Sequence, residues 1–293
     1  MGKELVSILI NNYNNGPFLR WCIDSALDQT YSNVEVIVYD DASTDDSLDI
    51  LRSYDDQIQV LAAKKNYGAE SINFNQANAI HQAFQQSKGD IICLLDGDDA
   101  FLPHKVEAVV AAFQANPAAV LVQHYFEIVN EHNQRSGVRK PLLIHDPMRF
   151  GQDHLAYYRS TNSLFDLYAQ TSALSFRRSY LELRLPLPED ELDLIWPDVR
   201  LTRLAPFYGQ VVVLPYIFTY YRMHQSNWVH SLEEENRTQK ARQQIYQYFN
   251  TTKPDATFPR LSLERTEQGR WCMWATQVKR WRTLLRKLGF KRI

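Results

Sequence analysis

Residues 91–99 are Ile91-Ile92-Cys93-Leu94-Leu95-Asp96-Gly97-Asp98-Asp99. An apolar run of this length predicts a buried strand, which here ends in a tight acidic turn. Three carboxylates within four residues repel one another unless a cation or hydrogen-bond donors share the site. Hard oxygen ligands suit Mg²⁺ or Mn²⁺, which bridge one or two carboxylates to substrate phosphates. A solvated Asp-Gly turn is the plainer alternative, because Asp-rich turns are common.

Strand and helix patterns alternate on both sides of this turn. The expected strands are 5–10, 34–39, 58–62, 90–95 and 119–124, and the helices between them include 18–27 and 104–115. This alternation predicts an α/β fold with a mostly parallel sheet covered by helices on both faces. Ligands bind such sheets at the carboxyl ends of the strands. We therefore expect the polar loops after Ile10, Tyr39 and Leu95 to lie along one rim.

The second half of the chain has weaker periodicity. Residues 126–168 suggest a hairpin with a turn around 134–137, followed by structure at 171–176. A helix is expected over 197–207 and two strands over 210–214 and 217–221. Residues from 231 onward have helical spacing, interrupted around 253–259.

Composition narrows the class of protein. With 293 residues, 45% of them hydrophobic, the chain is globular and long enough for one large domain with an appendage, or for two domains. Its three cysteines lie far apart and form neither a disulfide framework nor a zinc pattern. No signal-peptide pattern and no apolar run of about 18 residues is present, so a cytoplasmic location is expected. The loop 12–16 has a single glycine, which argues against a P-loop or a dinucleotide fingerprint.

Three segments, Val6–Asn14, Val38–Ser47 and Cys93–Asp99, together resemble family 2 glycosyltransferases of the GT-A fold. The resemblance extends over residues 4–227 and implies the nucleotide-diphospho-sugar transferase fold. It also implies an inverting enzyme that uses a nucleotide-diphospho-sugar, most commonly a UDP-sugar, and a divalent cation, Mg²⁺ or Mn²⁺. The departure at Asn11, where a proline is usual, leaves dTDP and GDP open as carriers.

The resemblance also implies a division of the chain. Residues 1–230 would form the catalytic domain, with a nucleotide-binding part (1–125) and an acceptor part (126–230). Residues 231–293 would form a helical, basic C-terminal extension. The acceptor would be a glycan, a lipid-linked saccharide or a polysaccharide of the cell envelope, and no nucleic acid is expected as a partner.

The same resemblance assigns residues of the nucleotide and metal site. Asn11, Tyr13 and Asp41 would hold the base. Asp96 would face the ribose or a metal-bound water, and Asp98 would be the metal ligand proper. Because an aromatic ring can stack on a base and a carboxylate can accept a base N–H, these residue types suit the task. A loop anchor for Tyr13 and a first-turn helix acid for Asp41 are the structural alternatives.

Inverting displacement needs a general base for the acceptor hydroxyl. The family places this acid at the start of a late helix, which here is Asp198 after Pro197. A purely structural first-turn acid is the alternative, because Pro and acids both suit that position. The competing acids Glu189, Asp190, Glu191 and Asp193 fit a solvated loop before the helix.

The segment Tyr221–Asn227 resembles the family's Y-R-x-H-x-x-N pattern. His224 would complete the metal sphere or touch the diphosphate, and Arg222 would support the diphosphate charge. Asp99 would orient the acceptor or support the metal ligands. A lone histidine is otherwise more often structural.

The C-terminal residues form a pattern of their own. From Arg270 to Ile293 there are eight Lys or Arg residues and no acid, so a chain of net charge −2 carries −10 before them. The apolar residues of this stretch recur at three- and four-residue spacing, which predicts one stripe on a helix. Such a helix either lies at an anionic membrane surface or packs on the catalytic domain or on a second subunit of a homodimer.

Two other functions remain open at this point. A non-catalytic nucleotide-sugar-binding subunit would have lost base or metal acids, yet all are present. A sugar-phosphate nucleotidyltransferase would open with a glycine- and arginine-rich loop after the first strand, which residues 11–17 lack.

Overall fold

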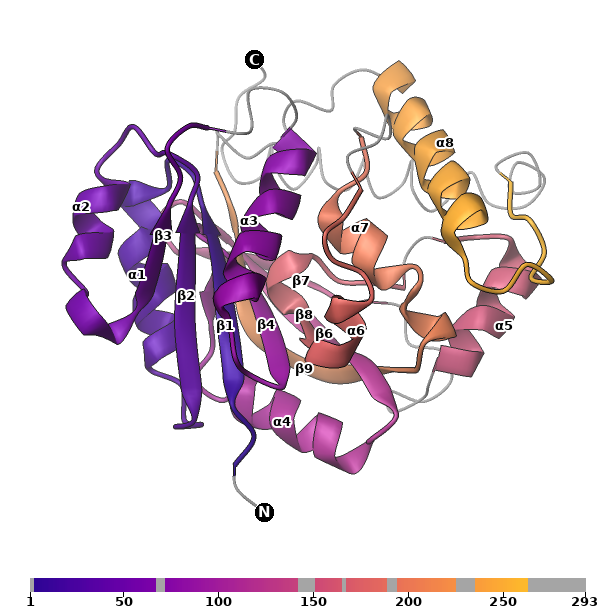
Figure 1. Cartoon of the computed structure of the whole chain (residues 1–293), viewed down its shortest axis with the longest axis horizontal. Helices are drawn as coiled ribbons and strands as arrows, with labels where there is room; N and C mark the ends of the chain where they lie inside the picture. Colours follow the sequence, from indigo (N-terminus) through magenta and orange to yellow (C-terminus); the bar gives the residue numbers. More distant parts are fainter. Residues whose placement is uncertain are drawn as a thin grey trace.

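The computed structural model describes residues 3–66, 72–141, 151–164, 167–188, 194–224 and 235–262. They form one nine-stranded sheet with the order β3-β2-β1-β4-β8-β6-β9-β5, and β7 pairs with β6 (Figure 1). The strands are β1 (Val6–Asn12), β2 (Val34–Asp40), β3 (Gln59–Ala62), β4 (Ile91–Asp96), β5 (Ala100–Phe101), β6 (Ala119–Asn130), β7 (Arg135–Arg139), β8 (Leu174–Arg177) and β9 (Gln210–Met223).

The four strands β3, β2, β1 and β4 are parallel neighbours, as the alternating pattern predicts. In their register Asn11 lies opposite both Tyr39 and Asp96, so three polar loops leave the sheet at one rim. Antiparallel β8 joins this half to the parallel pair β6 and β9. The expected α/β fold with a helix-flanked sheet is confirmed.

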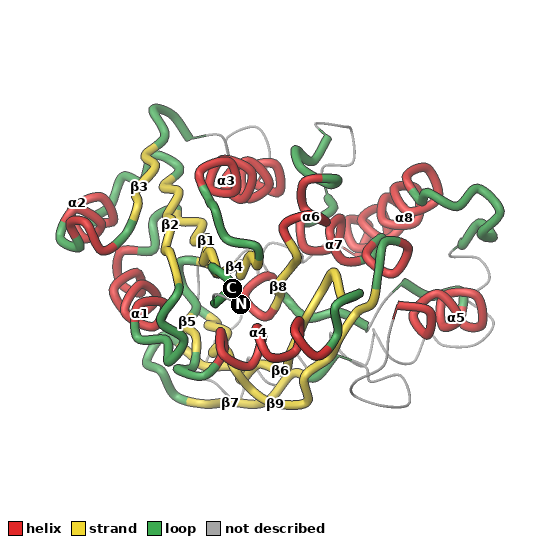
Figure 2. The backbone as a smooth tube through the Cα atoms, turned by 60° about the horizontal axis from the view of Figure 1, so that its bottom comes forward, coloured by secondary structure: helices red, strands yellow, loops and turns green. Residues whose placement is uncertain are grey.

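Helices cover both faces of the sheet (Figure 2). One core cluster packs α1, α2 and α4 against the sheet, and a second packs α3, α6 and α7 on the opposite face. Burial of these apolar faces, at about 25 cal/mol per Å², is what holds the layers together. The helices are α1 (Gly16–Leu27), α2 (Ser47–Arg52), α3 (Ile72–Gln86), α4 (Lys105–Ala115), α5 (Gly151–Thr161), α6 (Arg178–Glu182), α7 (Pro197–Thr202) and α8 (Glu235–Thr252).

A third core cluster joins α8 to the acceptor part of the chain. Tyr248 and Phe249 of α8 pack with Tyr158 of α5 and with Leu204, all fully buried. The first helix of the expected extension therefore shares a core with the residues before it. The basic stripe of residues 270–293 lies outside the described residues. None of the described helices is both long and apolar enough to cross a membrane.

Two details of the second half differ from the sequence expectation. The two strands expected over 210–214 and 217–221 are one strand, β9, whose register against β6 shifts beside Pro215. Proline lacks the N–H that a ladder needs, so it marks an irregularity here without ending the strand. The turn expected at 134–137 begins earlier, and Arg135 already starts β7.

Candidate active site

The turn after β2 is held by the first of its two aspartates. Asp40 accepts hydrogen bonds from the Asn12 amide (Nδ2–Oδ2 2.7 Å) and from the Ser43 hydroxyl (Oγ–Oδ2 2.6 Å). Asp41, the predicted base-binding residue, is 1% exposed, and its N–H donates to the carbonyl of Asn12 at 2.9 Å. Asp40 therefore fixes the turn on which Asp41 sits.

Tyr13 lies on the loop after β1 and is 42% exposed. This loop is tied to the turn after β2, because the N–H of Asn14 donates to Ser43 Oγ (2.9 Å) and Thr44 N–H donates to Asn14 Oδ1 (2.8 Å). The structure thus places the predicted base contacts on two connected loops, with an open aromatic ring on one and a buried carboxylate on the other.

The acidic turn after β4 lies directly against β1. The N–H of Gly97 donates to the carbonyl of Asn11 at 3.0 Å. A Cβ at position 97 would lie 2.8 Å from Asn12 Oδ1 and 3.1 Å from that same carbonyl, so only glycine fits without a shift. The close approach brings Asp96 and Asp98 to the rim occupied by Asn11.

Asp96 sits between two side-chain amides. Gln76 of α3 donates from Nε2 to Asp96 Oδ1 at 2.8 Å, and the Asn11 amide also hydrogen-bonds to this carboxylate. Burial raises the pKa of Asp96 to about 7, the charge of Asp98 adds to the effect, and the two amides oppose it. The carboxylate is held in a place where its negative charge is costly without further donors or a cation.

His224 and Asp98 form a close pair. His224 Nε2 lies 2.9 Å from Asp98 Oδ2, and the imidazole packs against Phe18 with ring centroids 4.8 Å apart. Two neighbouring ligands of an octahedral Mg²⁺ or Mn²⁺, each about 2.1 Å from the ion, are about 3 Å apart. The pair therefore fits one edge of such a coordination sphere. Among the described residues no group of three His, Cys, Asp or Glu side chains could hold a metal, so the remaining ligands would come from water and substrate.

Asp99 and Arg222 are both buried beside the acidic turn. Asp99 is fully buried and accepts from Ser172 Oγ (2.6 Å) and from the N–H of Arg222 (2.7 Å). Burial, and then its neighbours Asp98 and Asp96, raise its pKa well above the usual value. Asp99 ties the acidic turn to β9, an arrangement compatible with the predicted support of the metal ligands.

Arg222 is 1% exposed and all three of its guanidinium nitrogens donate to protein acceptors. These acceptors are the carbonyls of Asp98 and Asn130 and the side chain of Asn133, at 2.7–2.8 Å. The guanidinium also lies over the rings of Phe18 and Trp21, 4.6 Å from each centroid. Arg222 therefore braces the backbone of Asp98, and its predicted contact with the diphosphate stays a prediction.

Asp198 lies in the first turn of α7, which begins at Pro197 as predicted. Burial raises the pKa of Asp198, while the charge of Arg203 and the Val199 N–H oppose the rise. The charge of Asp198 in turn raises the pKa of Asp96. Burial and the charges of Asp99, Asp98, Asp96 and Asp198 also raise the pKa of Tyr221. The four carboxylates therefore all act electrostatically on the same side chain, although about 100 residues separate Asp198 from the others.

Two polar residues of this location were not identified from the sequence. Gln76 lies mid-helix in α3, in no motif that would mark it. Ser172 accepts from the N–H of Asp96 (3.0 Å) and donates to Asp99, so it connects the acidic turn to the segment before β8. The competing acids Glu189, Asp190, Glu191 and Asp193 and the residues from Gln225 to Asn227 lie outside the described residues.

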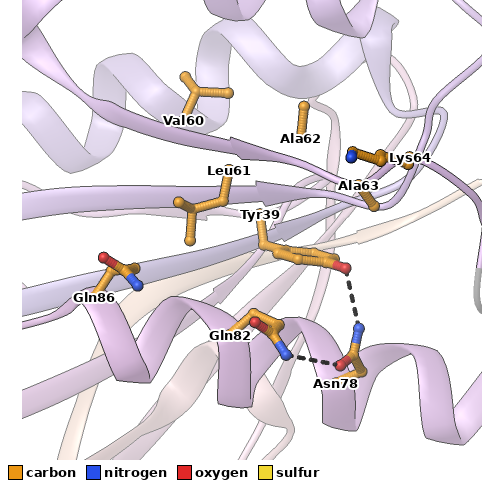
Figure 3. A pocket seen from close by; sticks show the side chains of 9 residues that line it. All are labelled: Tyr39, Val60, Leu61, Ala62, Ala63, Lys64, Asn78, Gln82 and Gln86. Atoms are coloured by element: carbon orange, nitrogen blue, oxygen red, sulfur yellow. Dashed lines mark hydrogen bonds between the residues drawn. The ribbon is translucent and has the colours of Figure 1, made fainter.

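A groove of about 510 Å³ lies beside the site, between β3 and α3. Figure 3 shows Asn78 of α3 pointing at the hydroxyl of Tyr39, to which it donates at 3.0 Å, and Gln82 donating to Asn78. None of the expected site residues lines this groove. Its lining residues Tyr39 and Asn78 each lie two residues from a residue of the site, Asp41 and Gln76 respectively.

Comparison with known proteins shows the family of the chain. The model of glycosyl transferase family 2 matches residues 7–180, more than half of the chain. An uncharacterised glycosyltransferase of Nostoc sp. is 29% identical over 253 residues, which cover 84% of this chain and 74% of that protein. The Escherichia coli enzyme WfaP, named as a UDP-Glc:alpha-D-GlcNAc-diphosphoundecaprenol beta-1,3-glucosyltransferase, is 33% identical over 42% of this chain and 47% of its own length.

Solved structures share the fold at low sequence identity. TarS of Staphylococcus aureus in complex with UDP-GlcNAc has a TM-score of 0.61 at 17% identity, covering 84% of this chain and 65% of that one. The mannosyltransferase PcManGT of Pyrobaculum calidifontis, in complex with GDP-Man and Mn²⁺, has a TM-score of 0.58 at 17% identity, covering 88% of this chain and 67% of that one.

Proposed function

The chain belongs to glycosyl transferase family 2, and on that premise we propose that it is an inverting, metal-assisted enzyme that moves a sugar from a UDP-sugar to an acceptor hydroxyl. The observation that carries the proposal is the pairing of Asp98 with His224 at 2.9 Å in the turn that follows Asp96, whose carboxylate also feels the charge of Asp198. Asp96 ends β4, Asp98 lies in the turn after it, and Asp198 lies in α7. If the acidic turn were merely solvated and Asp198 merely stabilised its helix, these carboxylates would have no reason to lie close together.

The donor lies along the rim of the sheet. Asn11, Tyr13 and Asp41 hold the base, and Asp96 faces the ribose or a metal-bound water. The diphosphate reaches Asp98 and His224, whose 2.9 Å separation fits two ligands of one cation. When bound, that Mg²⁺ or Mn²⁺ neutralises the charge that develops on the leaving nucleoside diphosphate.

Asp198 is the general base. Its carboxylate takes the proton of the acceptor hydroxyl as the hydroxyl oxygen attacks the anomeric carbon from the face opposite the diphosphate. One new C–O bond forms while the sugar–phosphate bond breaks, so the anomeric configuration inverts. The raised pKa of Asp198 supports this role, since a base is more effective when its pKa approaches the working pH.

The acceptor is a lipid-linked saccharide or a growing polysaccharide at the inner face of the membrane. Support comes from the names of two relatives. WfaP acts on a diphosphoundecaprenol-linked sugar. TuaG of Bacillus subtilis, 34% identical over 108 residues, is a putative teichuronic acid biosynthesis glycosyltransferase. Each match spans less than half of the relative, so the acceptor class is part of the proposal.

The test measures nucleoside-diphosphate release from a panel of UDP-, GDP- and dTDP-sugars with Mn²⁺ and candidate acceptors. Asp98→Ala and Asp198→Asn should each reduce transfer by at least 100-fold, and Asp49→Asn, a change at an exposed carboxylate of α2, should not. Release of pyrophosphate would indicate a nucleotidyltransferase, and donor binding without turnover would indicate a binding subunit. The anomeric configuration of the product, measured by NMR, tests inversion.

A further inference from the structure

The first half of α1 contacts both the acidic turn and the end of β9. Cys22 Sγ lies 3.5 Å from the carbonyl oxygen of Asp96. The ring of Phe18, one helical turn earlier, packs against the imidazole of His224 and against the guanidinium of Arg222. Residues four apart share one face of a helix. The helix that the apolar spacing predicts therefore presents this face to the residues that hold the proposed cation.

Phe18 contacts both sides of the metal pair. Its ring centroid lies 4.8 Å from that of His224, with the two planes tilted by 43°, and 4.6 Å from the guanidinium carbon of Arg222. Arg222 Nε in turn donates to the backbone carbonyl of Asp98 at 2.8 Å. One ring thus packs on the imidazole of the first ligand and on the guanidinium that holds the backbone of the second.

A metal ligand is effective when its direction is fixed before the ion arrives. Ligand atoms must be held within about 0.5 Å of the productive geometry, by packing and by hydrogen bonds to the ligand side chains. An imidazole rotates about two side-chain bonds, and ordering it when the ion binds costs free energy. The flat face of Phe18 restricts this rotation in advance, with His224 Nε2 already 2.9 Å from Asp98 Oδ2.

The opposite end of β4 provides a matched arrangement. There the guanidinium of Arg178 lies 4.7 Å from the ring centroid of Phe84, and its Nε donates to the carbonyl of Gly89 at 2.6 Å. The ring, the guanidinium and the braced backbone carbonyl are the same as at Phe18, but Gly89 precedes β4 whereas the acidic turn follows it. Loss of ring stacking on an arginine can therefore be separated from an effect on the metal.

We propose that Phe18 is a positioning residue of the metal pair, whose ring holds the imidazole of His224 toward Asp98 so that one cation can bind both. The inference rests on the proposed function and deepens it, because it assigns a task to a side chain that no metal-binding motif marks. A phenyl ring has no atom that ligates Mg²⁺ or Mn²⁺. Phe18 consequently acts on the cation only through its neighbours, chiefly His224.

The experiment measures Mn²⁺ binding by the electron paramagnetic resonance signal of the free ion, with UDP present, or GDP if the wild-type protein prefers it. This readout needs neither acceptor nor turnover. Phe18→Leu should raise the Kd for Mn²⁺ by about tenfold, whereas Phe18→Tyr, which keeps the ring, should retain nearly all of the affinity. Phe84→Leu is the matched control, and it should lower the melting temperature without changing this Kd.

A double-mutant cycle tests the route of the effect. In a His224→Ala background, Phe18→Leu should cause little further loss of Mn²⁺ affinity, because the imidazole through which it acts is gone. Additive losses would overturn the inference. So would an equal loss in Trp21→Leu, which removes the other ring over Arg222, because the effect would then pass through the guanidinium.

Two further outcomes are informative. An unchanged Kd in Phe18→Leu would overturn the positioning role and leave the transferase intact. Failure of wild-type protein to bind Mn²⁺ with either nucleotide would instead contradict the metal-assisted part of the proposed function, and this inference with it. Melting curves show whether Phe18→Leu folds, and Phe18→Met, which also lacks a ring, decides if it does not.

Discussion

His224 Nε2 lies 2.9 Å from Asp98 Oδ2, although 126 residues separate the two in sequence. The contact joins the end of β9 to the turn after β4. Both residues carry metal-binding atoms, and both lie beside Arg222, which holds the backbone of Asp98. Substitutions of His224 therefore test metal binding separately from the stability of the fold.

We expect His224→Ala to raise the Mn²⁺ concentration needed for half-maximal transfer by about tenfold or more, because the cation loses one of two protein ligands. Activity titrated with Mn²⁺ after EDTA treatment measures this. His104→Ala, at an imidazole that is 70% exposed, provides the control. An unchanged Mn²⁺ requirement would remove His224 from the metal site.

Asp198 should set the acidic limb of the pH–rate profile. Its pKa is raised by burial, so kcat/KM should fall, as pH decreases, at a higher pH than an ordinary aspartate would give. Arg203 lowers this pKa by its charge. Arg203→Met should therefore move the limb to higher pH, and Arg203→Lys should leave it nearly in place. A limb that is the same in both variants would argue against Asp198 as the base.

Arg222→Met should destabilise the fold rather than weaken donor binding selectively. Its removal leaves the carbonyls of Asp98 and Asn130 and the side chain of Asn133 without their donor. We expect the free energy of unfolding to fall by about 3 kcal/mol, measured in urea. Arg135→Met, at a side chain that is 65% exposed, should cost less than about 1 kcal/mol. A diphosphate-specific loss of affinity at unchanged stability would contradict the structural role.

His124 should make the fold sensitive to acid. Burial, with a contribution from the charge of Lys105, lowers its pKa to about 3. The unfolded chain takes up a proton at this residue below about pH 6.5 while the folded chain does not, so stability falls as pH decreases. Between pH 7 and pH 5 this amounts to roughly 2 kcal/mol.

His124→Gln retains a donor for the carbonyl of Tyr125, which His124 Nδ1 meets at 2.8 Å. Urea unfolding at pH 7 and pH 5 measures the effect. Between these two pH values, the free energy of unfolding of the variant should fall by roughly 2 kcal/mol less than that of the wild-type protein. His104→Gln should follow the wild-type protein. Parallel pH profiles for wild type and His124→Gln would show that His124 is not the group responsible.

The local pattern of the sequence determined the parallel half of the sheet and the rim of the site. Apolar runs that end in Asn11, Asp40 and Asp96 are parallel neighbours, and the carboxyl ends of such strands meet at one edge. Pro197 before Asp198 likewise indicated the start of α7, because proline suits a first helical turn. These features depend on residues close together in the chain.

Only the tertiary structure showed which charged residues of the site segments stabilise the fold. Asp99 lies in the turn after β4 and Arg222 lies on β9, and both are buried, so their side chains hydrogen-bond to the protein. Gln76 meets Asp96 because α3 packs across the sheet, and α8 joins the acceptor part through aromatic side chains. Such contacts depend on the direction of a side chain and on the packing of elements that are distant in sequence, and local periodicity predicts neither.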